Sequence, residues 1–198
     1  MIEIRAIAND ADYEDVCSLI RRSQKAESEA TGVLFNTKGL TPAQLKDEIK
    51  GYDGVCFCAF DNSVMAGTLS LFADYKKKWY SREESGKIIK YVAVAPEYQG
   101  KGIASKLIDK AKKEAGELVL SVSTGEKNTH AIHLYERNGF ILVDVTRGLI
   151  NNAYKMAYWK SGCPIKANKL NRHIMAARMK CAVKKRLFKP TVTEEMFR

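Results

Sequence analysis

Residues 86–108 read GKIIKYVAVAPEYQGKGIASKLI, and this stretch carries the strongest structural signal in the chain. Its first part, as far as Val94, is rich in apolar residues, which is typical of a buried strand. Pro96 interrupts that strand, and the glycines at 100 and 102 precede apolar residues at helical spacing. The stretch therefore predicts a buried strand, a tight turn and a helix, in that order.

The segments on either side extend this pattern into a mixed α/β sheet. Apolar alternation or apolar runs predict strands at residues 2–5, 55–60, 64–72, 86–96, 117–123, 140–146 and 149–159. The strands at 55–60 and 64–72 are expected to form a hairpin around a tight turn at Asp61–Asn62, and the last two strands are expected to pair. Helices are expected after the N-cap Asn9–Asp10, over 41–51 with a capping box at Thr41–Gln44, and over 100–115 and 129–138, with a loop over 26–40. The order β-α-α-β-β-β-α-β-α-β-β predicts a mixed central sheet of about seven strands with helices on both faces. The unit at 86–123 predicts a parallel strand pair joined by a crossover helix.

Length and composition limit the class of protein. The chain has 198 residues, of which 45% are hydrophobic and 28% charged, which suits one soluble domain of roughly 100–200 residues with an appendage. Collagen, coiled coil and disorder are excluded by this composition. No apolar run approaches the roughly 18–20 residues of a membrane span. The first ten residues, MIEIRAIAND, alternate like a strand and do not resemble a signal peptide, so we expect a cytoplasmic protein.

Charge divides the chain into two parts. Residues 1–154 contain 21 basic and 21 acidic residues, whereas residues 155–198 contain 12 basic and two acidic ones. We therefore expect a neutral domain at 1–159 and a basic helical extension at 160–198, with an apolar stripe at Leu170, Ile174, Ala177 and Cys181. The stripe is expected to pack on the sheet or on a second subunit, as in a homodimer. Nucleic acid or a membrane surface are the alternatives for the basic face.

The turn at residues 99–104, QGKGIA, is a candidate anion site. Glycines let several backbone N–H groups converge, and a helix N-terminus adds a partial positive charge, so such a turn can hold a diphosphate. It is neither a Walker loop nor a GxGxxG sequence. Glycine-rich turns between a strand and a helix also serve packing, so this turn alone leaves both interpretations open.

A second segment, NTHAIHLYERNGF at 128–140, adds to the signal. Ala131, Leu134 and Tyr135 fall on one face of the expected helix. Asn128 lies where a strand of a parallel pair ends, the edge at which α/β sheets bind ligands.

Together these two segments resemble the GNAT family of acetyl-CoA-dependent N-acetyltransferases. YVAVAPEYQGKGIASKLI resembles the central motif of that family, and NTHAIHLYERNGF resembles the motif that follows it, about 30 residues on. The resemblance covers roughly residues 1–158, with specific motifs at 91–140. It implies a GNAT-like acyl-CoA N-acyltransferase fold, acetyl-CoA as cosubstrate, and an amine acceptor that is a small molecule or a protein amine.

The resemblance also implies roles for particular residues. The backbone N–H of Val92 would hold the acetyl carbonyl oxygen, and Val94 would follow the pantetheine arm. Tyr135 would protonate the leaving thiolate. The other expected cofactor-binding residues are Gln99, Gly100, Lys101, Gly102, Ile103, Ala104 and Ser105 for the diphosphate, and Asn128 and Ala131 for the pantetheine arm. The implied reaction is direct attack by a neutral amine in a ternary complex, with Tyr135 and Val92 as the catalytic pair.

The general base stays open at this stage. Some family members carry a glutamate four residues before the position that matches Val92, but here that position is Ile88, which cannot accept a proton. The candidates that remain are Glu29, Glu83, Glu84, Glu126 and His130. The acceptor pocket is expected from residues 20–40 and 146–156, with Glu27, Glu29, Phe35 and Asn36 in the first segment.

Neither a metal nor a disulfide is expected. The five cysteines form no CxxC pair, and Cys56 and Cys58 alternate within an expected strand, which favours buried reduced thiols. The alternative to an enzyme is a non-catalytic module that binds acyl-CoA and docks to nucleic acid or a ribosome through its basic tail.

Overall fold

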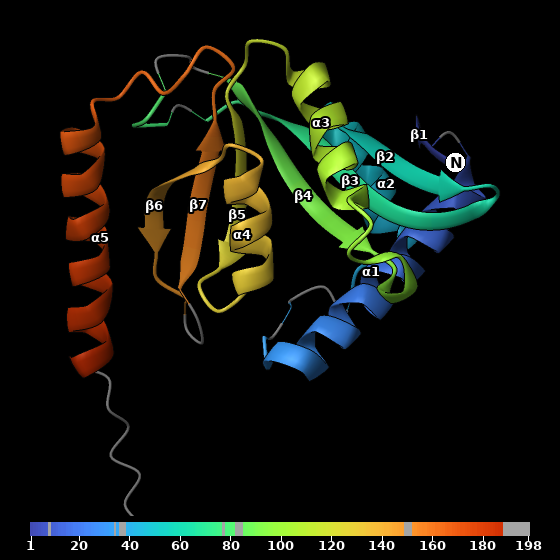
Figure 1. Ribbon diagram of the computed structural model, residues 1–198, viewed down its shortest axis with the longest axis horizontal. Helices are drawn as coiled ribbons and strands as arrows, with labels where there is room; N and C mark the ends of the chain where they lie inside the picture. Colours follow the sequence, from blue (N-terminus) through green and yellow to red (C-terminus); the bar gives the residue numbers. More distant parts are fainter. Residues whose placement is uncertain are drawn as a thin grey trace, which may run out of the picture.

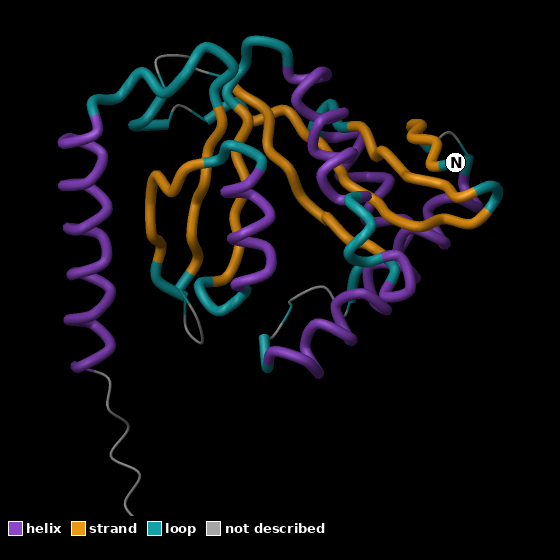
Figure 2. Tube along the Cα trace, viewed as in Figure 1, coloured by secondary structure: helices purple, strands orange, loops and turns teal. Residues whose placement is uncertain are grey.

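The computed structural model describes residues 1–7, 9–33, 35, 39–76, 78–81, 85–148 and 152–187, with side chains as far as Cys181. A seven-stranded sheet, in the order β1-β2-β3-β4-β5-β7-β6, runs through the molecule (Figures 1 and 2). Its strands are β1 (Ile2–Ala6), β2 (Val55–Asp61), β3 (Val64–Asp74), β4 (Gly86–Val94), β5 (Leu120–Gly125), β6 (Ile141–Thr146) and β7 (Ala153–Tyr158). The mixed seven-stranded sheet predicted from the sequence is confirmed.

Five α-helices and one short 3-10 helix accompany the sheet in the described residues. They are α1 (Asp10–Thr31), α2 (Pro42–Gly51), η1 (Pro96–Tyr98), α3 (Ile103–Ala115), α4 (Thr129–Arg137) and α5 (Ala167–Leu187). The Thr41 hydroxyl accepts from the Gln44 N–H at 3.2 Å, and the Gln44 side chain accepts from the Thr41 N–H at 3.0 Å. This reciprocal capping box starts α2 as its sequence predicts.

The parallel pair and the hairpins follow the expected topology. β4 and β5 are parallel, and the other neighbouring strands are antiparallel. β2 and β3 are joined by the tight turn that the sequence predicts, and Asn62 adopts a positive φ of 56° there.

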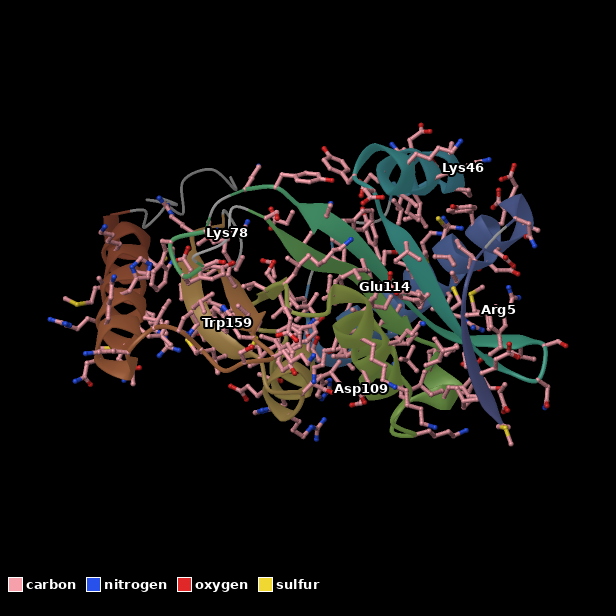
Figure 3. The ribbon with its side chains drawn as sticks, turned by 90° about the horizontal axis from the view of Figure 1, so that it is seen from above. Arg5, Lys46, Lys78, Asp109, Glu114 and Trp159 are labelled. Carbon is pink, nitrogen blue, oxygen red and sulfur yellow. The ribbon has the colours of Figure 1, made fainter. Side chains whose placement is uncertain are left out.

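Helices cover both faces of the sheet. Val16 and Ile20 of α1 and Leu45 of α2 are buried with Cys56 and Cys58 on one face. The opposite face carries α3 and α4, whose apolar residues form the larger core cluster with Leu69, Ile89 and Leu120. In Figure 3, Lys46 of α2 lies on one side of the sheet, and Asp109 and Glu114 of α3 lie on the other. About 25 cal/mol is gained per Å² of apolar surface that such packing removes from water.

Gly67 of β3 allows α3 to approach the sheet closely. A Cβ atom built at this position would lie 2.9 Å from Ile103 Cγ2 and 3.2 Å from the carbonyl oxygen of Ala93. The backbone oxygen cannot move without disturbing the strand, so the contact requires a residue without a side chain. This close approach sets the depth at which the start of α3 lies against β4.

Several expected boundaries are wrong. β5 begins at Leu120 and not at residue 117, because a turn in which the Leu118 N–H donates to the carbonyl oxygen of Ala115 precedes it. The sequence predicts a loop from residue 26, but α1 continues to Thr31 and ends at Gly32, whose φ is 69°. The segment is polar but contains good helix formers such as alanine and glutamate, and the glycine provides the left-handed C-cap. α3 begins at Ile103, later than expected, because Gly100 and Gly102 adopt positive φ values of 74° and 75°.

The C-terminal helix α5 packs along the edge of the sheet beside β6 (Figure 1). Leu170 and Ile174 contact a cluster that contains Val143 and Ala157, so the apolar stripe packs on the sheet of its own chain. Val183 and Leu187 flank this stripe in the sequence, but the structure does not describe side chains beyond Cys181. Among the described residues, no helix is both long enough and apolar enough to cross a bilayer.

Substitutions in α5 test this packing. Leu170 is 9% exposed, so Leu170→Ala should lower the free energy of unfolding by about 2 kcal/mol through lost burial and a small cavity. Met175 on the outer side is 57% exposed, so Met175→Ala should change the free energy of unfolding by less than about 0.5 kcal/mol. Urea unfolding of both variants measures the difference. Equal effects would show that α5 does not pack on β6 in solution.

Candidate functional site

The parallel strands β4 and β5 diverge, and their divergence forms the centre of the candidate site. They pair only from Lys87 to Ile89 of β4, opposite Leu120 to Val122 of β5. Beyond this point β4 stays with β3 as far as Val94, while β5 follows β7 as far as Gly125. Figure 1 shows the two strands separating toward their C-terminal ends. The edge of β4 around Val92 that faces β5 therefore pairs with no other strand of the described residues.

A bulge in β4 accompanies this divergence. The register between β3 and β4 shifts between Thr68 and Ser70, and Tyr91 opposite the shift has a φ of 54°. Such a conformation is costly for a residue with a bulky side chain and persists only where surrounding contacts hold it. The Tyr91 hydroxyl donates to both carboxylate oxygens of Glu48, at 3.0 and 3.2 Å. This contact between β4 and α2 fixes the residue that immediately precedes Val92.

The pKa of Tyr91 reflects the same contacts. Burial and the negative charge of Glu48 raise it to about 12. The phenol therefore stays protonated and keeps donating to Glu48 across the physiological pH range.

The glycine-rich turn connects the end of β4 to α3. Gln99 Nε2 donates to the carbonyl oxygen of Val94 at 3.4 Å, which folds the turn back on the strand. A side chain built at Gly100 or Gly102 would meet no atom within 4 Å, so the space above the turn is open. The first N–H groups of a helix have no partner within the helix, and here they belong to the start of α3.

Helix α4 provides the wall on the β5 side. Asn128 is its N-cap, and the side-chain oxygen accepts from the Ala131 N–H at 3.1 Å. This capping role accounts for the burial of Asn128 and was not predicted from the sequence. Tyr135 is buried against Phe140, with ring centroids 5.7 Å apart, and burial raises the pKa of its hydroxyl. The hydroxyl is therefore neutral at physiological pH and available as a donor.

A cavity of about 920 Å³ joins these features. This is within the range of about 300–1,000 Å³ that is common for small-molecule sites. The residues expected from the sequence that line it are Val92, Val94, Gln99, Gly100, Gly102, Ile103, Ala104, Ser105, Asn128, Ala131 and Tyr135. Lys101 does not line it, and its Nζ lies 4.8 Å from the centroid of the Tyr98 ring instead.

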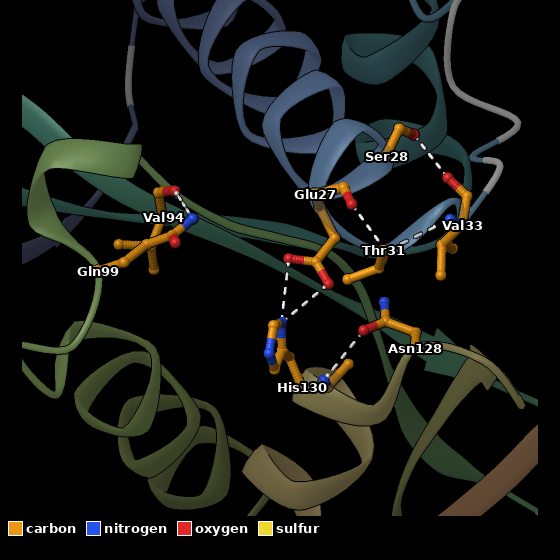
Figure 4. A network of polar contacts seen from close by, with 9 residues as sticks. Glu27, Ser28, Thr31, Val33, Val94, Gln99, Asn128 and His130 are labelled. Atoms are coloured by element: carbon orange, nitrogen blue, oxygen red, sulfur yellow. Dashed lines mark hydrogen bonds and ion pairs between the residues drawn. The ribbon is translucent and has the colours of Figure 1, made fainter.

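The end of α1 closes the cavity on the remaining side. Ser23, Gln24 and Glu27 line it, together with Phe35. Glu27 reaches across to α4, where its two carboxylate oxygens lie 3.1 and 3.4 Å from His130 Nδ1 (Figure 4). From the sequence, Glu27 is expected in the acceptor pocket and His130 is a candidate base. No local pattern pairs them, because they are 103 positions apart.

The structure separates the candidates for the general base. Glu29 is exposed and lies 4.0 Å from Lys25, and Glu126 accepts from Asn152 Nδ2 at 2.9 Å. Neither of these two glutamates lines the cavity, whereas His130 does. Glu83 and Glu84 lie outside the described residues.

The expected acceptor region is only partly described. Residues 20–40 contribute the α1 side chains and Phe35 to the cavity, while Asn36 and residues 149–151 fall outside the described part. The described residues of 146–156 do not line the cavity. A link that was not predicted joins α3 to α4, since Asn138 Nδ2 donates to Ser105 Oγ at 3.1 Å. No sequence pattern signals a contact of that kind.

In the part of the chain that the structure describes, the cysteines and acidic residues form neither a disulfide nor a cluster suited to a metal ion. All five cysteines are free thiols, and Cys56 Sγ lies 3.3 Å from the Thr68 hydroxyl in the core. Among the described residues, no three His, Cys, Asp or Glu side chains are grouped so that they could hold a metal ion.

Comparison with known proteins identifies relatives of this arrangement. The model of the acetyltransferase (GNAT) family matches residues 20–140, which is more than half of the chain. Streptothricin acetyltransferase from Escherichia coli is 28% identical over 144 residues, covering 66% of this chain and 78% of that protein.

Solved structures of the same fold cover most of the chain. A GNAT-family acetyltransferase from Streptococcus agalactiae gives a TM-score of 0.66 at 17% identity, over 80% of this chain and 95% of that one. The PaiA N-acetyltransferase from Thermoplasma acidophilum, solved in complex with coenzyme A, gives a TM-score of 0.62 at 21% identity and covers 80% of this chain and 99% of that one. Arabidopsis thaliana NAA60, solved in complex with acetyl-CoA, gives a TM-score of 0.58 at 18% identity and covers 82% of this chain and 100% of that one.

The Tyr91–Glu48 contact generates a prediction about alkaline stability. The pKa of Tyr91 is raised from 10 to about 12, so the stabilisation is complete below pH 10 and is lost as the pH rises toward 12. Tyr91→Phe should therefore be less stable at pH 8, because the hydrogen bond is missing, but should lose less stability between pH 8 and 11. Urea unfolding at the two pH values measures this.

The exposed Tyr75 provides the control for that experiment. Tyr75→Phe should leave the loss of stability between pH 8 and 11 as it is in the parent protein. If Tyr91→Phe showed the same loss as the parent, the contact with Glu48 would not hold the phenol in its protonated form.

Proposed function

The chain belongs to the acetyltransferase (GNAT) family, and from this premise we propose that it transfers the acetyl group of acetyl-CoA to a primary amine by direct attack in a ternary complex. The observation that carries the proposal is the divergence of β4 from β5 beside an open glycine turn, with Tyr135 in the same cavity. A cavity that contains an unbonded strand edge, a helix N-terminus and a neutral phenol suits an extended acyl thioester.

The residues of the cavity fit acetyl-CoA along its length. The turn from Gln99 to Ser105 offers backbone N–H groups and an open surface to the diphosphate. Val94 and Ala131 line the space proposed for the pantetheine arm, and Asn128 lies at its edge. Lys101 would contribute its backbone N–H, because its side chain lies against the Tyr98 ring and does not line the cavity.

Acetyl-CoA supplies a thioester whose carbonyl carbon is electrophilic. The Val92 N–H, on the unpaired edge of β4, would donate to the carbonyl oxygen as negative charge develops there. The neutral Tyr135 hydroxyl would donate its proton to the departing sulfur. Val92 would thus stabilise the charge on the carbonyl oxygen, and Tyr135 would act on the sulfur that leaves.

The acceptor we propose is a small amine or a protein amine. The relative from Escherichia coli is named for streptothricin, so this compound is one amine to test. Simple diamines, amino acids, aminoglycosides and peptide amines complete a panel that covers both classes. The half-buried Glu27 in the cavity wall favours acceptors that carry positive charge.

We propose two functional parts in the chain, an acetyltransferase domain at 1–159 and the basic extension at 160–198. The solved relatives cover 80–82% of the chain, which supports a domain of this extent. Five free thiols support action in a reducing compartment such as the cytoplasm. A non-catalytic module docked to nucleic acid or a ribosome is the alternative, and homodimerisation is a further proposal.

An acetyl-transfer assay tests the proposal directly. Release of free thiol from acetyl-CoA, followed with a thiol reagent, should depend on protein and on at least one amine of the panel, and mass spectrometry should find the acetylated amine. Acetyl-CoA binding without transfer to any amine would favour the non-catalytic module.

A glycine substitution tests the diphosphate turn. Gly102 and Gly32 have nearly the same left-handed conformation, with φ of 75° and 69°, and a Cβ atom built at either would meet no atom within 4 Å. Replacement of either by alanine should cost about 1 kcal/mol of stability. Gly102→Ala alone should weaken acetyl-CoA binding, by about tenfold, because its Cβ occupies the open side of the turn. Calorimetry on both variants measures this, and equal affinities would contradict the role of the turn.

A phenylalanine substitution tests the proposed acid. Tyr135→Phe keeps the buried ring and removes only the hydroxyl. It should lower kcat at least about 100-fold while acetyl-CoA binding stays close to that of the parent, since positioned acids contribute about 10²–10⁴. Tyr75→Phe, at an exposed position, should leave kcat unchanged. A decrease of less than about threefold for Tyr135→Phe would argue against the acid.

A further inference from the structure

We infer that His130 is the general base of the acetyl transfer and that Glu27 positions it. This inference rests on the proposed function and names the group that deprotonates the acceptor. The sequence leaves this group open because Ile88 stands where some relatives carry a glutamate. His130 is the base candidate that the structure places in the wall of the cavity containing Val92 and Tyr135.

The two residues come from opposite walls of the cavity. Glu27 lies in the last turns of α1, and His130 lies in the first turn of α4 (Figure 4). The Glu27 side chain is only 19% exposed, whereas the His130 side chain is 70% exposed. The carboxylate is thus held within the wall, and the imidazole it contacts remains accessible to an incoming amine.

The end of α1 is fixed so that Glu27 keeps this position. The Thr31 hydroxyl donates to the carbonyl oxygen of Glu27 at 2.7 Å and accepts from the Val33 N–H at 3.3 Å. The Ser28 hydroxyl donates to the carbonyl oxygen of Val33 at 2.6 Å (Figure 4). These bonds tie the last helical turn to the residues that follow Gly32.

The contact with Glu27 determines which nitrogen of His130 can act. A carboxylate accepts hydrogen bonds only, so Nδ1 carries the proton and donates it to Glu27 at 3.1 Å. In the neutral ring Nε2 is then unprotonated and is the basic atom. The negative charge of Glu27 also stabilises the imidazolium that forms when Nε2 takes up a proton.

The proton balance of the transfer follows from these roles. An amine with a pKa near 10 arrives mostly as an ammonium ion, and His130 Nε2 takes its excess proton. The neutral nitrogen forms a bond to the acetyl carbon, the carbon–sulfur bond breaks, and the sulfur receives a proton from Tyr135. The nitrogen then releases one more proton, which restores the hydroxyl of Tyr135. The proton held by His130 passes to solvent, so the net products are the amide, the free thiol and one proton.

His133 provides a matched control on the same helix. It lies one turn from His130 and also lines the cavity, but it pairs with Glu136 of its own helix and not with α1, with Nδ1 3.3 Å from Glu136 Oε2. It is as exposed as His130, but its carboxylate partner is solvent-exposed. The other titratable groups that line the same cavity are Glu27 of α1, which contacts His130, and Tyr98, Tyr135 and Arg137.

Rates as a function of pH test the inference, with full-length protein and an amine identified by the acetyl-transfer assay. His130→Gln should lower kcat at least about 100-fold, the lower end of the usual contribution of a general base. It should also remove the loss of activity at acidic pH that protonation of the base would cause. Glu27→Gln should lower kcat less than His130→Gln does and should leave the KM for acetyl-CoA unchanged, because the imidazole loses part of the contact that orients it. His133→Gln should match the parent protein.

Acetyl-CoA affinity, measured by calorimetry on each variant, separates catalysis from folding and binding. If His130 is the base, His130→Gln binds acetyl-CoA as the parent does. A His130→Gln variant with kcat within about threefold of the parent, or with an unchanged acidic limb, would overturn the inference and leave the proposed function intact. Loss of acetyl-CoA binding in that variant would also overturn it, by making His130 a binding residue. No transfer by the parent protein to any amine would overturn the proposed function and this inference together.

Discussion

The separation of β4 from β5 after Ile89 and Val122 is the constraint on which the site depends. Two parallel strands normally continue their hydrogen bonds, and the edge that is left unpaired here would be costly without another partner. The bulge at Tyr91, with its left-handed backbone and its hydroxyl held by Glu48, turns the strand away from its neighbour. The unpaired edge, the glycine turn and the buried face of α4 then border one cavity. An acyl thioester that lies along this edge would replace the missing strand.

The helices on the two faces would contribute different parts of the proposed chemistry. α3 and α4 lie on one face and supply the N-terminal amides and the buried phenol of Tyr135. α1 packs on the other face, and its last turns extend beyond the sheet to bring Glu27 to His130. The amine and the thioester would thus approach from different elements and meet where β4 and β5 separate. The Glu27–His130 contact spans these two walls, which is why it is suited to receive a proton from the acceptor.

Much of the fold could be predicted because its signals are local. The apolar run before Pro96, the capping box at Thr41 and the glycines at 100 and 102 each specify their own segment, and the structure places a strand, a helix and a turn there. The extension of α1 to Thr31 could not be predicted, because the sequence of a polar helical segment without an apolar stripe resembles that of a loop. The contacts of Glu27 with His130, and of Asn138 with Ser105, could not be predicted either, since they join residues that are 103 and 33 positions apart. Contacts of this kind follow only from the assembled fold.

Calorimetric titration with acetyl-CoA tests the central claim, that the space between the diverging strands is an acyl-CoA site. Coenzyme A and ATP serve as controls at moderate salt, because ATP carries phosphates but lacks the pantetheine arm that would follow β4. We expect one-to-one binding of acetyl-CoA at micromolar concentration, similar or weaker binding of coenzyme A, and clearly weaker binding of ATP. Absence of binding at millimolar acetyl-CoA would contradict the claim and would reduce the turn at Gln99–Ala104 to a structural corner.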